Sequence, residues 1–295
     1  MTWAEVFADN DRTILRRHHL VEAGATGKSL TAAVANGFLV RVMRDHYALP
    51  ATSSAVEQAV RVGGRLCCVS AIAQLGIFTF DSSAPHIHLK RQASRSRSPH
   101  DRFVALTNGN RGGVILHWSP LVDEHDGNEF CVGIIDALVQ AVRCQEPSHA
   151  VATLDSALFL GRITEVDLSE VFRRLPLRLR YLRELVDGRA EAGQETVLRL
   201  LLHSAGLKYE LQVVVDGVGR VDILVEGVLV LEADSRLAHD GWEKHVIDRW
   251  RDVQLARRHY MSLRPAYQHT MFHPEEVLEA VLALLDGWGI RHPRT

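Results

Sequence analysis

Long apolar runs, paired cysteines and a strong net charge are all missing from this 295-residue sequence. No apolar run approaches the roughly 18 residues of a membrane span, and the opening "MTWAEVFADNDRTILRR" lacks the apolar core of a signal peptide. CxxC spacing is also absent, so neither zinc nor disulfides are indicated for the four cysteines, which are Cys67, Cys68, Cys131 and Cys144. We therefore expect a cytoplasmic protein with reduced thiols and no membrane partner.

The net charge of −2 argues against polyanion binding over the whole surface. Two local clusters of cations stand out against this average. The first cluster contains Lys90, Arg91, Arg95, Arg97, Arg102 and Arg111. The second cluster contains Arg173, Arg174, Arg178, Arg180 and Arg183. Such clusters are compatible with a nucleic-acid track, although a single cluster is more often an ordinary solvated surface.

The length of the chain exceeds what one ordinary core organises, so we expect more than one domain. Shifts in composition place the domains at residues 1–50, 51–188 and 189–295. The fold class we expect is a multidomain α+β or α/β protein. Its parts would be an N-terminal winged helix, a mixed middle domain and a C-terminal domain with the order αβββαβα.

Residues 10–50 have the order helix, turn, helix and ribbon. The segment "NDRTILRRHHLVEAG" predicts a helix that opens at Asn10 or Asp11 and ends at Gly24, and "TGKSLTAAVANG" predicts a second helix. The alternation in "FLVRVMRDHYAL" predicts a hairpin that turns near Arg44. This order is that of a winged helix, and the alternative is a small helical cap with ordinary surface polar residues.

In a winged helix, the second helix enters the major groove of double-stranded DNA and the ribbon touches the backbone. The candidate helix residues are Lys28, Ser29, Thr31 and Asn36, and the candidate wing residues are Arg41, Arg44 and His46. The later segment "QASRSRSPHDR" has no apolar periodicity, so we expect a mobile basic loop that follows phosphates. The candidates in and before this loop are Lys90, Arg91, Arg95 and Arg97.

The middle segment alternates helical patterns with two short strand patterns, "PHIHLKR" and "GVILHWS". Helices are predicted for "CCVSAIAQLGI", for "FCVGIIDALVQAVRCQ" and for "TEVDLSEVFRRLP", with Thr164 as the N-cap of the last. His86, His88 and His117 lie in the strand patterns. Alternating histidines on a strand are more often half-exposed polar residues than metal ligands, and that is our interpretation here.

The last hundred residues present a clear succession of elements. "QETVLRLLLHSAG" is an amphipathic helix, "KYELQVVV", "GRVDILVEG" and "VLVLEAD" are strands, and "DGWEKHVIDRWRDVQLARRH" is a long helix. A strand in "MSLRPAYQ" and a helix in "HPEEVLEAVLALL" complete the chain. Within the strands stand three acids, Asp222, Glu232 and Asp234. They are either solvated residues at strand ends or ligands of a divalent metal.

The order of elements and acids resembles the PD-(D/E)XK nuclease fold, also called the restriction-endonuclease-like fold. Over residues 194–285 it is most similar to a stand-alone domain of unknown function related to very-short-patch-repair endonucleases. The matching motifs are "ETVL", "ELQV", "VDI", "LEADS" and "DRWRDVQL". The resemblance implies a metal-dependent endonuclease whose site residues are Glu195, Gln212, Asp222, Glu232 and Asp234.

Phosphodiester hydrolysis gives the same acids a chemical role. A metal polarises the phosphoryl oxygen and lowers the pKa of the attacking water, and Mg²⁺ or Mn²⁺ prefers carboxylate oxygens. Asp222 and Glu232 on adjacent strands can share an edge, and Asp234 lies on the same face as Glu232. Asp222, Glu232 and Asp234 are therefore the predicted metal ligands.

Two departures from the resembling patterns bear on activity. Asp234 stands where many nucleases of this fold have a lysine, so Lys244 is the nearest cation that could steady the attacking water. Ser235 stands where the resembling family has glycine. Lys244 has the alternative of an ordinary surface lysine, and the whole site has the alternative of an inactive relic.

The N-terminal part is similar to AbiEi-type antitoxins, on "TGKSLTAAVANGFLVRVMRDHYALP" followed by "CCVSAIAQLGI" and "HWSPL". That family combines a winged helix with a larger domain and represses its own operon, which implies a cognate toxin or a second copy of the chain as a further partner. The two likenesses together resemble actinobacterial proteins. The chain is thus a DNA-binding nuclease, an antitoxin-like repressor with an inactive nuclease fold, or a binding protein that touches no nucleic acid.

Overall fold

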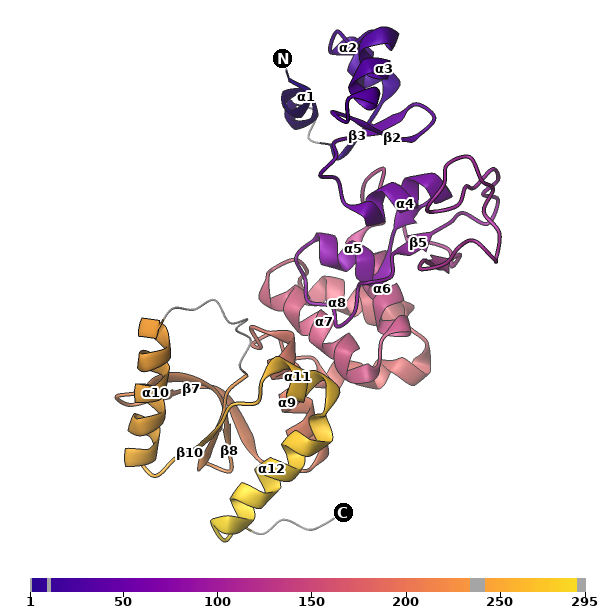
Figure 1. Cartoon of the computed structure of the whole chain (residues 1–295). Coiled ribbons are helices and arrows are strands. Elements are labelled where there is room, and N and C mark those ends of the chain that lie inside the picture. The colour runs from indigo at the N-terminus through magenta and orange to yellow at the C-terminus, as the bar shows by residue number, and fades with distance from the viewer. Residues whose placement is uncertain (1, 10–11, 234–241, 291–295) are drawn as a thin grey trace. The chain divides into compact units, whose positions relative to one another are not determined.

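The computed structural model describes residues 2–9, 12–233 and 242–290, and within the last range the side chains from 246 onward. The described chain is mixed α/β with three small sheets, which agrees with the expected multidomain α+β class at that coarse level (Figure 1). Two compact units can be distinguished: Met1–Leu75 with Asp81–Gln140, and Gly76–Phe80 with Ala141–Thr295. None of the described helices is both long enough and apolar enough to cross a bilayer.

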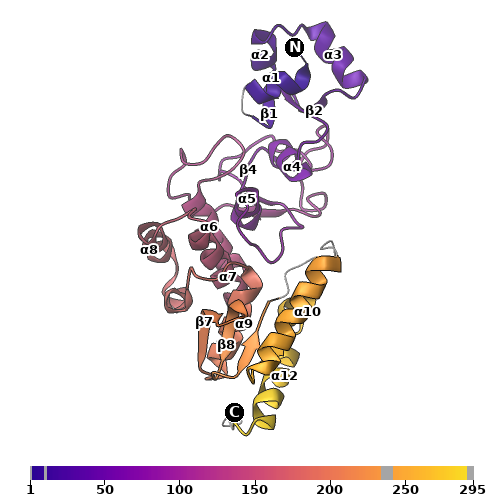
Figure 2. The same ribbon diagram turned by 90° about the vertical axis from the view of Figure 1, so that its left-hand side faces the viewer.

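The N-terminal end of the first unit carries three short helices on a small antiparallel sheet (Figure 2). The sheet order is β1-β3-β2. Thr26 caps the third helix, because its hydroxyl accepts the N–H of Ser29 at 3.1 Å. In chain order the elements are α1 (Trp3–Asp9), β1 (Ile14–Arg16), α2 (Arg17–Glu22), α3 (Gly27–Ala35), β2 (Val40–Met43) and β3 (His46–Ala48).

The first predicted helix was wrong at its start. Ile14–Arg16 is a strand, and the helix begins only at Arg17. Ile14 pairs with Ala48 and is buried, so tertiary pairing outweighs the local helical pattern. Asn10 and Asp11, the predicted first residues, lie outside the described part of the chain.

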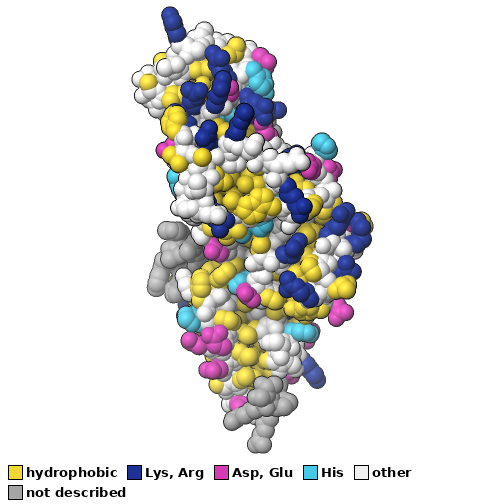
Figure 3. Space-filling view, turned by 90° about the vertical axis from the view of Figure 1, so that its right-hand side faces the viewer, with side chains coloured by type: hydrophobic (Ala, Val, Ile, Leu, Met, Phe, Trp, Pro, Cys, Tyr) yellow, Lys and Arg dark blue, Asp and Glu magenta, His cyan; other side chains and the backbone are white. Residues whose placement is uncertain are grey.

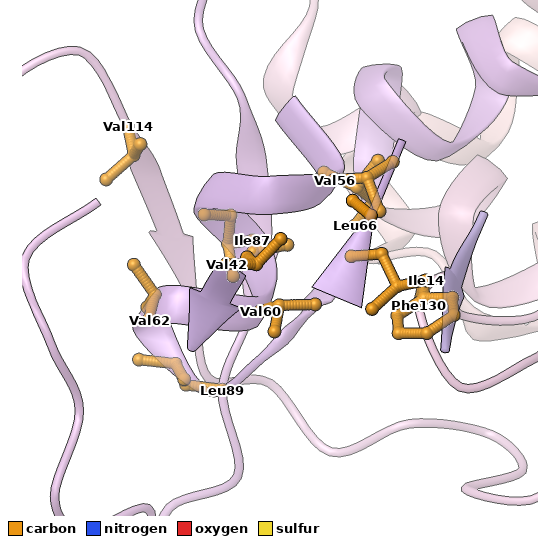
Figure 4. Close-up of a cluster of buried hydrophobic side chains, with 12 residues drawn as sticks. Ile14, Val42, Val56, Val60, Val62, Leu66, Ile87, Leu89, Val114 and Phe130 are labelled. Atoms are coloured by element: carbon orange, nitrogen blue, oxygen red, sulfur yellow. The ribbon is translucent and has the colours of Figure 1, made fainter. Parts of the chain in front are cut away.

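The rest of the first unit is a three-stranded sheet with helices packed around it. Strand β5 pairs antiparallel with β4 and parallel with β6. Figure 4 shows the hydrophobic cluster of this part, in which Leu66 lies near Phe130 and Ile14, and Ile87 lies near Val42. In chain order the elements are α4 (Ser54–Val62), β4 (Arg65–Leu66), α5 (Cys68–Gln74), β5 (His86–His88), β6 (Ile115–His117) and α6 (Ile134–Cys144).

Gly127 forms a turn that no residue with a side chain fits. Its φ is +86°, and an added Cβ would lie 2.5 Å from the carbonyl oxygen of Cys131. We expect Gly127→Ala to lower the free energy of unfolding by about 1–3 kcal/mol from backbone strain and by a similar amount from overpacking. Gly113→Ala is the matched control, since Gly113 has a φ of +80° and open space around it. Equal losses in urea unfolding would contradict the packing part of this prediction.

The second unit begins with a helical layer. Thr164 caps α8 as predicted, because its hydroxyl accepts the N–H of Asp167 at 3.2 Å while Asp167 bonds back to the N–H of Thr164. The carboxylate of Asp155 on α7 is buried against Arg199 on α9. In chain order the elements are α7 (Pro147–Phe159), α8 (Glu165–Arg174), the 3₁₀ helix η1 (Leu177–Leu185) and α9 (Gly193–Ser204).

The remainder of the second unit is a four-stranded sheet in the order β10-β9-β8-β7. Strands β7, β8 and β9 are antiparallel to one another, and β10 joins β9 in parallel. The predicted elements occur in the predicted order, with one short helix, α11, that was not predicted. These elements are β7 (Tyr209–Val215), β8 (Gly219–Val225), β9 (Leu229–Leu231), α10 (Trp242–Arg257), β10 (Met261–Leu263), α11 (Tyr267–Phe272) and α12 (Pro274–Gly287).

This sheet has an apolar cluster on each face. Ile223 and Leu231 pack with Leu198 and Val281 of α9 and α12. Their neighbours along the strands, Leu224 and Val230 among them, pack instead with Leu255 of α10. Because successive side chains of a strand point to opposite faces, the sheet lies between α10 and the pair α9 and α12 (Figure 1).

Candidate functional site

The predicted carboxylates and amide come together on the second unit's sheet, beside the point where β9 ends. Glu195 lies in the first turn of α9, Gln212 on β7, Asp222 on β8, and Glu232 directly after β9. Gln212 Nε2 donates a hydrogen bond to Glu195 Oε2 at 3.1 Å. The N–H of Ala233 donates to Asp222 Oδ2 at 3.0 Å. Four residues that are distant in the sequence therefore form one polar cluster.

Gln212 holds an unusual backbone conformation within this cluster. Its φ is +54°, which is rare for a residue with a side chain. The pairing of β7 with β8 places it opposite Asp222, between the pairs Leu211 with Ile223 and Val213 with Val221. Its Oε1 is buried and has no hydrogen-bond partner in the described structure. This amide oxygen is therefore free to accept a bond from a ligand.

Burial raises the pKa of all three carboxyls of the cluster. The pKa of Glu195 rises to about 7, first because of burial and then because Asp222 adds a like charge. Burial also raises the pKa of Asp222 and of Glu232. Crowded buried acids of this kind favour a nearby cation.

Two arginines supply positive charge to Glu232. Arg251 of α10 lies 2.9 Å from Glu232 Oε1, and Arg264, which follows β10, forms a second ion pair with Oε2. Arg264 also lies 2.9 Å from Asp252. Glu232 is only 7% exposed, so the solvated strand-end interpretation is wrong for it. Arg251 therefore reaches from α10 across to the acid that follows β9.

Arg264 was not among the predicted site residues, although a pattern in the sequence points to it. Strand β10 runs parallel to β9, with Leu263 opposite Leu231. The next residues along the two strands are Arg264 and Glu232. A cation directly after the fourth strand was therefore the indication that sequence reasoning missed.

The predicted metal site is only partly visible. Asp234 lies outside the described residues, and so does the side chain of Lys244. Among the described side chains, Glu195, Asp222 and Glu232 do not gather their oxygens within 4.8 Å of one another. The carboxylates are thus neighbours in one network, with arginines rather than a third carboxylate closest to Glu232.

The raised pKa of Glu195 predicts a pH dependence of stability. Between about 4.5 and about 7 the folded chain keeps a proton on Glu195 that the unfolded chain has released. The free energy of unfolding of the metal-free chain should therefore fall as the pH rises through this window. Urea unfolding at several values from about pH 5 to about pH 8 should show a shallower fall for Glu195→Gln than for the wild type. Parallel pH profiles would contradict the prediction.

The predicted recognition residues of the first unit differ in how free they are. Lys28, Thr31 and Asn36 are exposed on or next to α3, but the hydroxyl of Thr31 donates to the carbonyl of Gly27 at 2.9 Å. Ser29 is engaged in the capping of α3, where its hydroxyl donates to the carbonyl of Thr26 at 2.9 Å. Because Ser29 takes part in the cap of α3, it is a weaker candidate for contacting DNA.

The predicted wing residues flank the turn between β2 and β3. Arg41 and Arg44 are exposed. His46 is half-buried, and its Nδ1 lies 2.9 Å from the carbonyl oxygen of Arg44. The wing therefore offers two exposed cations and a histidine that is engaged within the turn.

The basic loop has a similar mixture. Arg91 and Arg95 are exposed, while Lys90 lies 2.6 Å from Glu124. Arg97 is half-buried, and its backbone N–H donates to the backbone carbonyl of Arg61. The segment predicted to be a mobile loop also forms an isolated antiparallel β-bridge between Arg97 and Ala105.

The second arginine cluster does not form a free cationic track. Arg173 and Arg174 both pair with Glu170, and Arg183 pairs with Glu165. Arg180 donates to the carbonyl oxygens of Leu175 and Arg173. The interpretation as an ordinary surface therefore fits this cluster.

A different group of side chains in the structure could hold a metal ion. Cys68, His86, His117 and Cys144 each offer one ligand atom, and these four atoms all lie within 4.8 Å of one another. His86 is buried and His117 is half-buried, and their Nδ1 and Nε2 atoms are 3.0 Å apart. His86 and His88 are buried, so their interpretation as half-exposed polar residues is wrong for these two and fits only His117. The expectation that the histidines and cysteines bind no metal stays a prediction.

No protein-family model matches the chain, and a search of curated proteins finds no match either.

Proposed function

We propose that the chain is a DNA-binding protein whose second unit carries a metal-dependent endonuclease-like site. The observation that carries the proposal is the convergence of Glu195, Gln212, Asp222 and Glu232 on one sheet, beside the end of β9. They arrive there in the element order that the resembling nucleases have. The N-terminal order α1-β1-α2-α3-β2-β3, with its exposed cations, supports a winged helix as the DNA-binding part.

The donor set of the cluster suits a hard divalent cation. Carboxylate oxygens of Asp222 and Glu195 and the unpartnered Oε1 of Gln212 are the ligand types that Mg²⁺ and Mn²⁺ prefer. When bound, such an ion would polarise a phosphoryl oxygen and lower the pKa of a water molecule. Glu232 can join the ligands only if it exchanges Arg264 or Arg251 for the ion.

Recognition of the DNA falls to the first unit in this proposal. Lys28, Thr31 and Asn36 present polar and cationic groups from one helix, and Arg41 and Arg44 present cations from the wing. Figure 3 shows Lys and Arg side chains gathered over the N-terminal segment. Counterion release makes such binding steeply dependent on salt.

The ion pairs of Glu232 favour a second candidate, an antitoxin-like repressor that keeps the nuclease fold without its activity. Arg251 and Arg264 already neutralise Glu232, so the folded chain is electrostatically satisfied there without a metal. In this case a cognate toxin or a second copy of the chain would be the partner.

One pair of experiments separates these functions. Binding of Mn²⁺ is measured by calorimetry and nicking of a plasmid is measured with Mg²⁺ or Mn²⁺, for the wild type and for Asp222→Ala with Glu232→Ala. A nuclease predicts that binding and nicking disappear together in the double variant and persist in Glu210→Ala, an exposed acid on β7. DNA binding without metal uptake or nicking would establish the repressor instead.

DNA binding is tested separately by salt titration. For Lys28→Ala with Arg44→Ala we expect weaker affinity and a shallower salt slope, since each lost phosphate contact reduces the slope by about 1. Arg173→Ala is the control, because its guanidinium is already paired with Glu170. Affinity that does not change with salt in the wild type would exclude a nucleic-acid function.

A further inference from the structure

We propose that Cys68, His86, His117 and Cys144 form a tetrahedral Zn²⁺ site that fastens the middle of the chain. The four ligand atoms lie within 4.8 Å of one another. Two thiolates and two imidazoles are the ligand set of structural zinc sites, with Zn–S distances of about 2.3 Å and Zn–N distances of about 2.0–2.1 Å. This site is separate from the carboxylates of the second unit and independent of their function.

The spacing of the two histidines is close to that required. Two nitrogens held tetrahedrally at the usual Zn–N distance stand about 3.3 Å apart. His86 Nδ1 and His117 Nε2 are 3.0 Å apart, so a movement of a few tenths of an ångström suffices. Both rings lie on neighbouring parallel strands, since β5 pairs with β6.

The backbone holds these ligands in place before any metal is bound. The N–H of Cys68 donates to Gln140 Oε1 at 3.1 Å, and the N–H of His86 donates to Ser70 Oγ at 2.8 Å. Cys68 has a φ of +51°, a left-handed conformation that is costly for a residue with a side chain. Cys144 is the last residue of α6, and this unbroken helix carries it to the other three ligands.

Charge and ligand type select zinc over the ions expected at the carboxylates. Each thiol releases one proton on binding, so two thiolates and two neutral imidazoles around Zn²⁺ have a net charge of zero. A neutral complex suits a place where Cys68 and His86 are buried. Mg²⁺ prefers oxygen ligands and would not take this set.

The fold around the site explains what a metal would add. Strands β4, β5 and β6 have only two or three residues each, and residues 89–114 between β5 and β6 form no regular element. Such a small sheet provides few hydrogen bonds of its own. A metal would join β5, β6, α5 and α6 at one point, as structural zinc does in small domains.

The test uses the full chain purified under reducing conditions. We expect about one zinc per chain by elemental analysis, and after chelation we expect Co²⁺ to give a thiolate-to-cobalt charge-transfer band with the intense visible bands of tetrahedral cobalt. X-ray absorption of the zinc-loaded wild type should show sulfur and nitrogen neighbours in equal number. Reduced wild type that takes up neither ion, or zinc without sulfur neighbours, would overturn the proposal.

The variant that isolates the site is Cys144→Ser. Cys144 is exposed at a helix end, so its substitution should leave the metal-free chain folded. We expect the Zn²⁺ affinity to fall by more than about 100-fold. Substituting a residue that only hydrogen-bonds to a metal ligand already lowers metal affinity by about 10–100-fold. Cys131→Ser is the control, because Cys131 is a free cysteine outside the ligand set. An equal loss of Zn²⁺ affinity in the control would refute the zinc site. So would a Cys68–Cys144 disulfide in wild type that was purified under reducing conditions.

Discussion

Replacing Arg199 by Met is expected to lower the free energy of unfolding by about 3–5 kcal/mol. The guanidinium of Arg199 lies 2.9 Å from Asp155 Oδ2, and the two side chains are 5% and 1% exposed. Asp155 also accepts hydrogen bonds from the hydroxyl of Thr196 and the N–H of Asp187, both at 2.7 Å. Methionine fills much of the same space, but it leaves a buried carboxylate without its cation.

The measurement for Arg199→Met is urea unfolding against a matched exposed pair. Arg173→Met removes one of the two cations paired with Glu170 on α8, where Arg173 is 65% exposed, and should change stability by less than about 1 kcal/mol. Burial already raises the pKa of Asp155 to about 6 in the presence of Arg199. The loss in Arg199→Met should therefore be smaller below that pH, where a proton can replace the missing charge. A small loss at neutral pH would show that Asp155 needs no cation.

Replacing Arg264 by Met is expected to cost the metal-free chain about 3 kcal/mol, the lower end of the range for a broken buried pair. The cost is at the lower end because Arg251 still holds Glu232. Arg264 is 19% exposed and pairs with both Glu232 and Asp252, so both carboxylates lose a cation. If Glu232 can serve as a metal ligand, Mn²⁺ should restore more stability to Arg264→Met than it adds to the wild type.

The control for Arg264→Met is Arg249→Met. Arg249 pairs with the same Asp252, but it lies one turn away on α10 and is 60% exposed. The Arg249→Met substitution should lower the free energy of unfolding by no more than about 1 kcal/mol, with or without Mn²⁺. Thermal unfolding with and without Mn²⁺ measures both effects. No response to Mn²⁺ in Arg264→Met would favour the repressor over the nuclease.

The hydrophobic periodicity of the sequence predicted most of the regular elements. These elements are stabilised by local interactions or by the packing of a single apolar face. The apolar run of β8 and the apolar stripe of α9 are readable in the sequence, and so is the capping of α8 by Thr164. Ile14–Arg16 escaped prediction because its strand depends on pairing with His46–Ala48, more than 30 residues later. The local pattern of apolar residues contains no information about such a distant pairing strand.

The carboxylate cluster was predictable as a set of residues and not as an electrostatic arrangement. The order of Glu195, Gln212, Asp222 and Glu232 along the chain, with the likeness it carries, indicated that they converge. Their charge balance depends on Arg251 and Arg264, which reach Glu232 from α10 and from the end of β10. Ion pairs between such distant positions are set by how the layers pack.

The sequence by itself determined where the chain is apolar, where most of its helices and strands lie, and which acids belong to one sheet. Only the tertiary structure decided which charges meet and that Cys68, His86, His117 and Cys144 form one cluster. These four ligands come from two helices and two strands with no shared spacing. A spacing motif reveals a metal site only when neighbouring ligands stand on the same turn or hairpin, and here the packing of separate elements creates it.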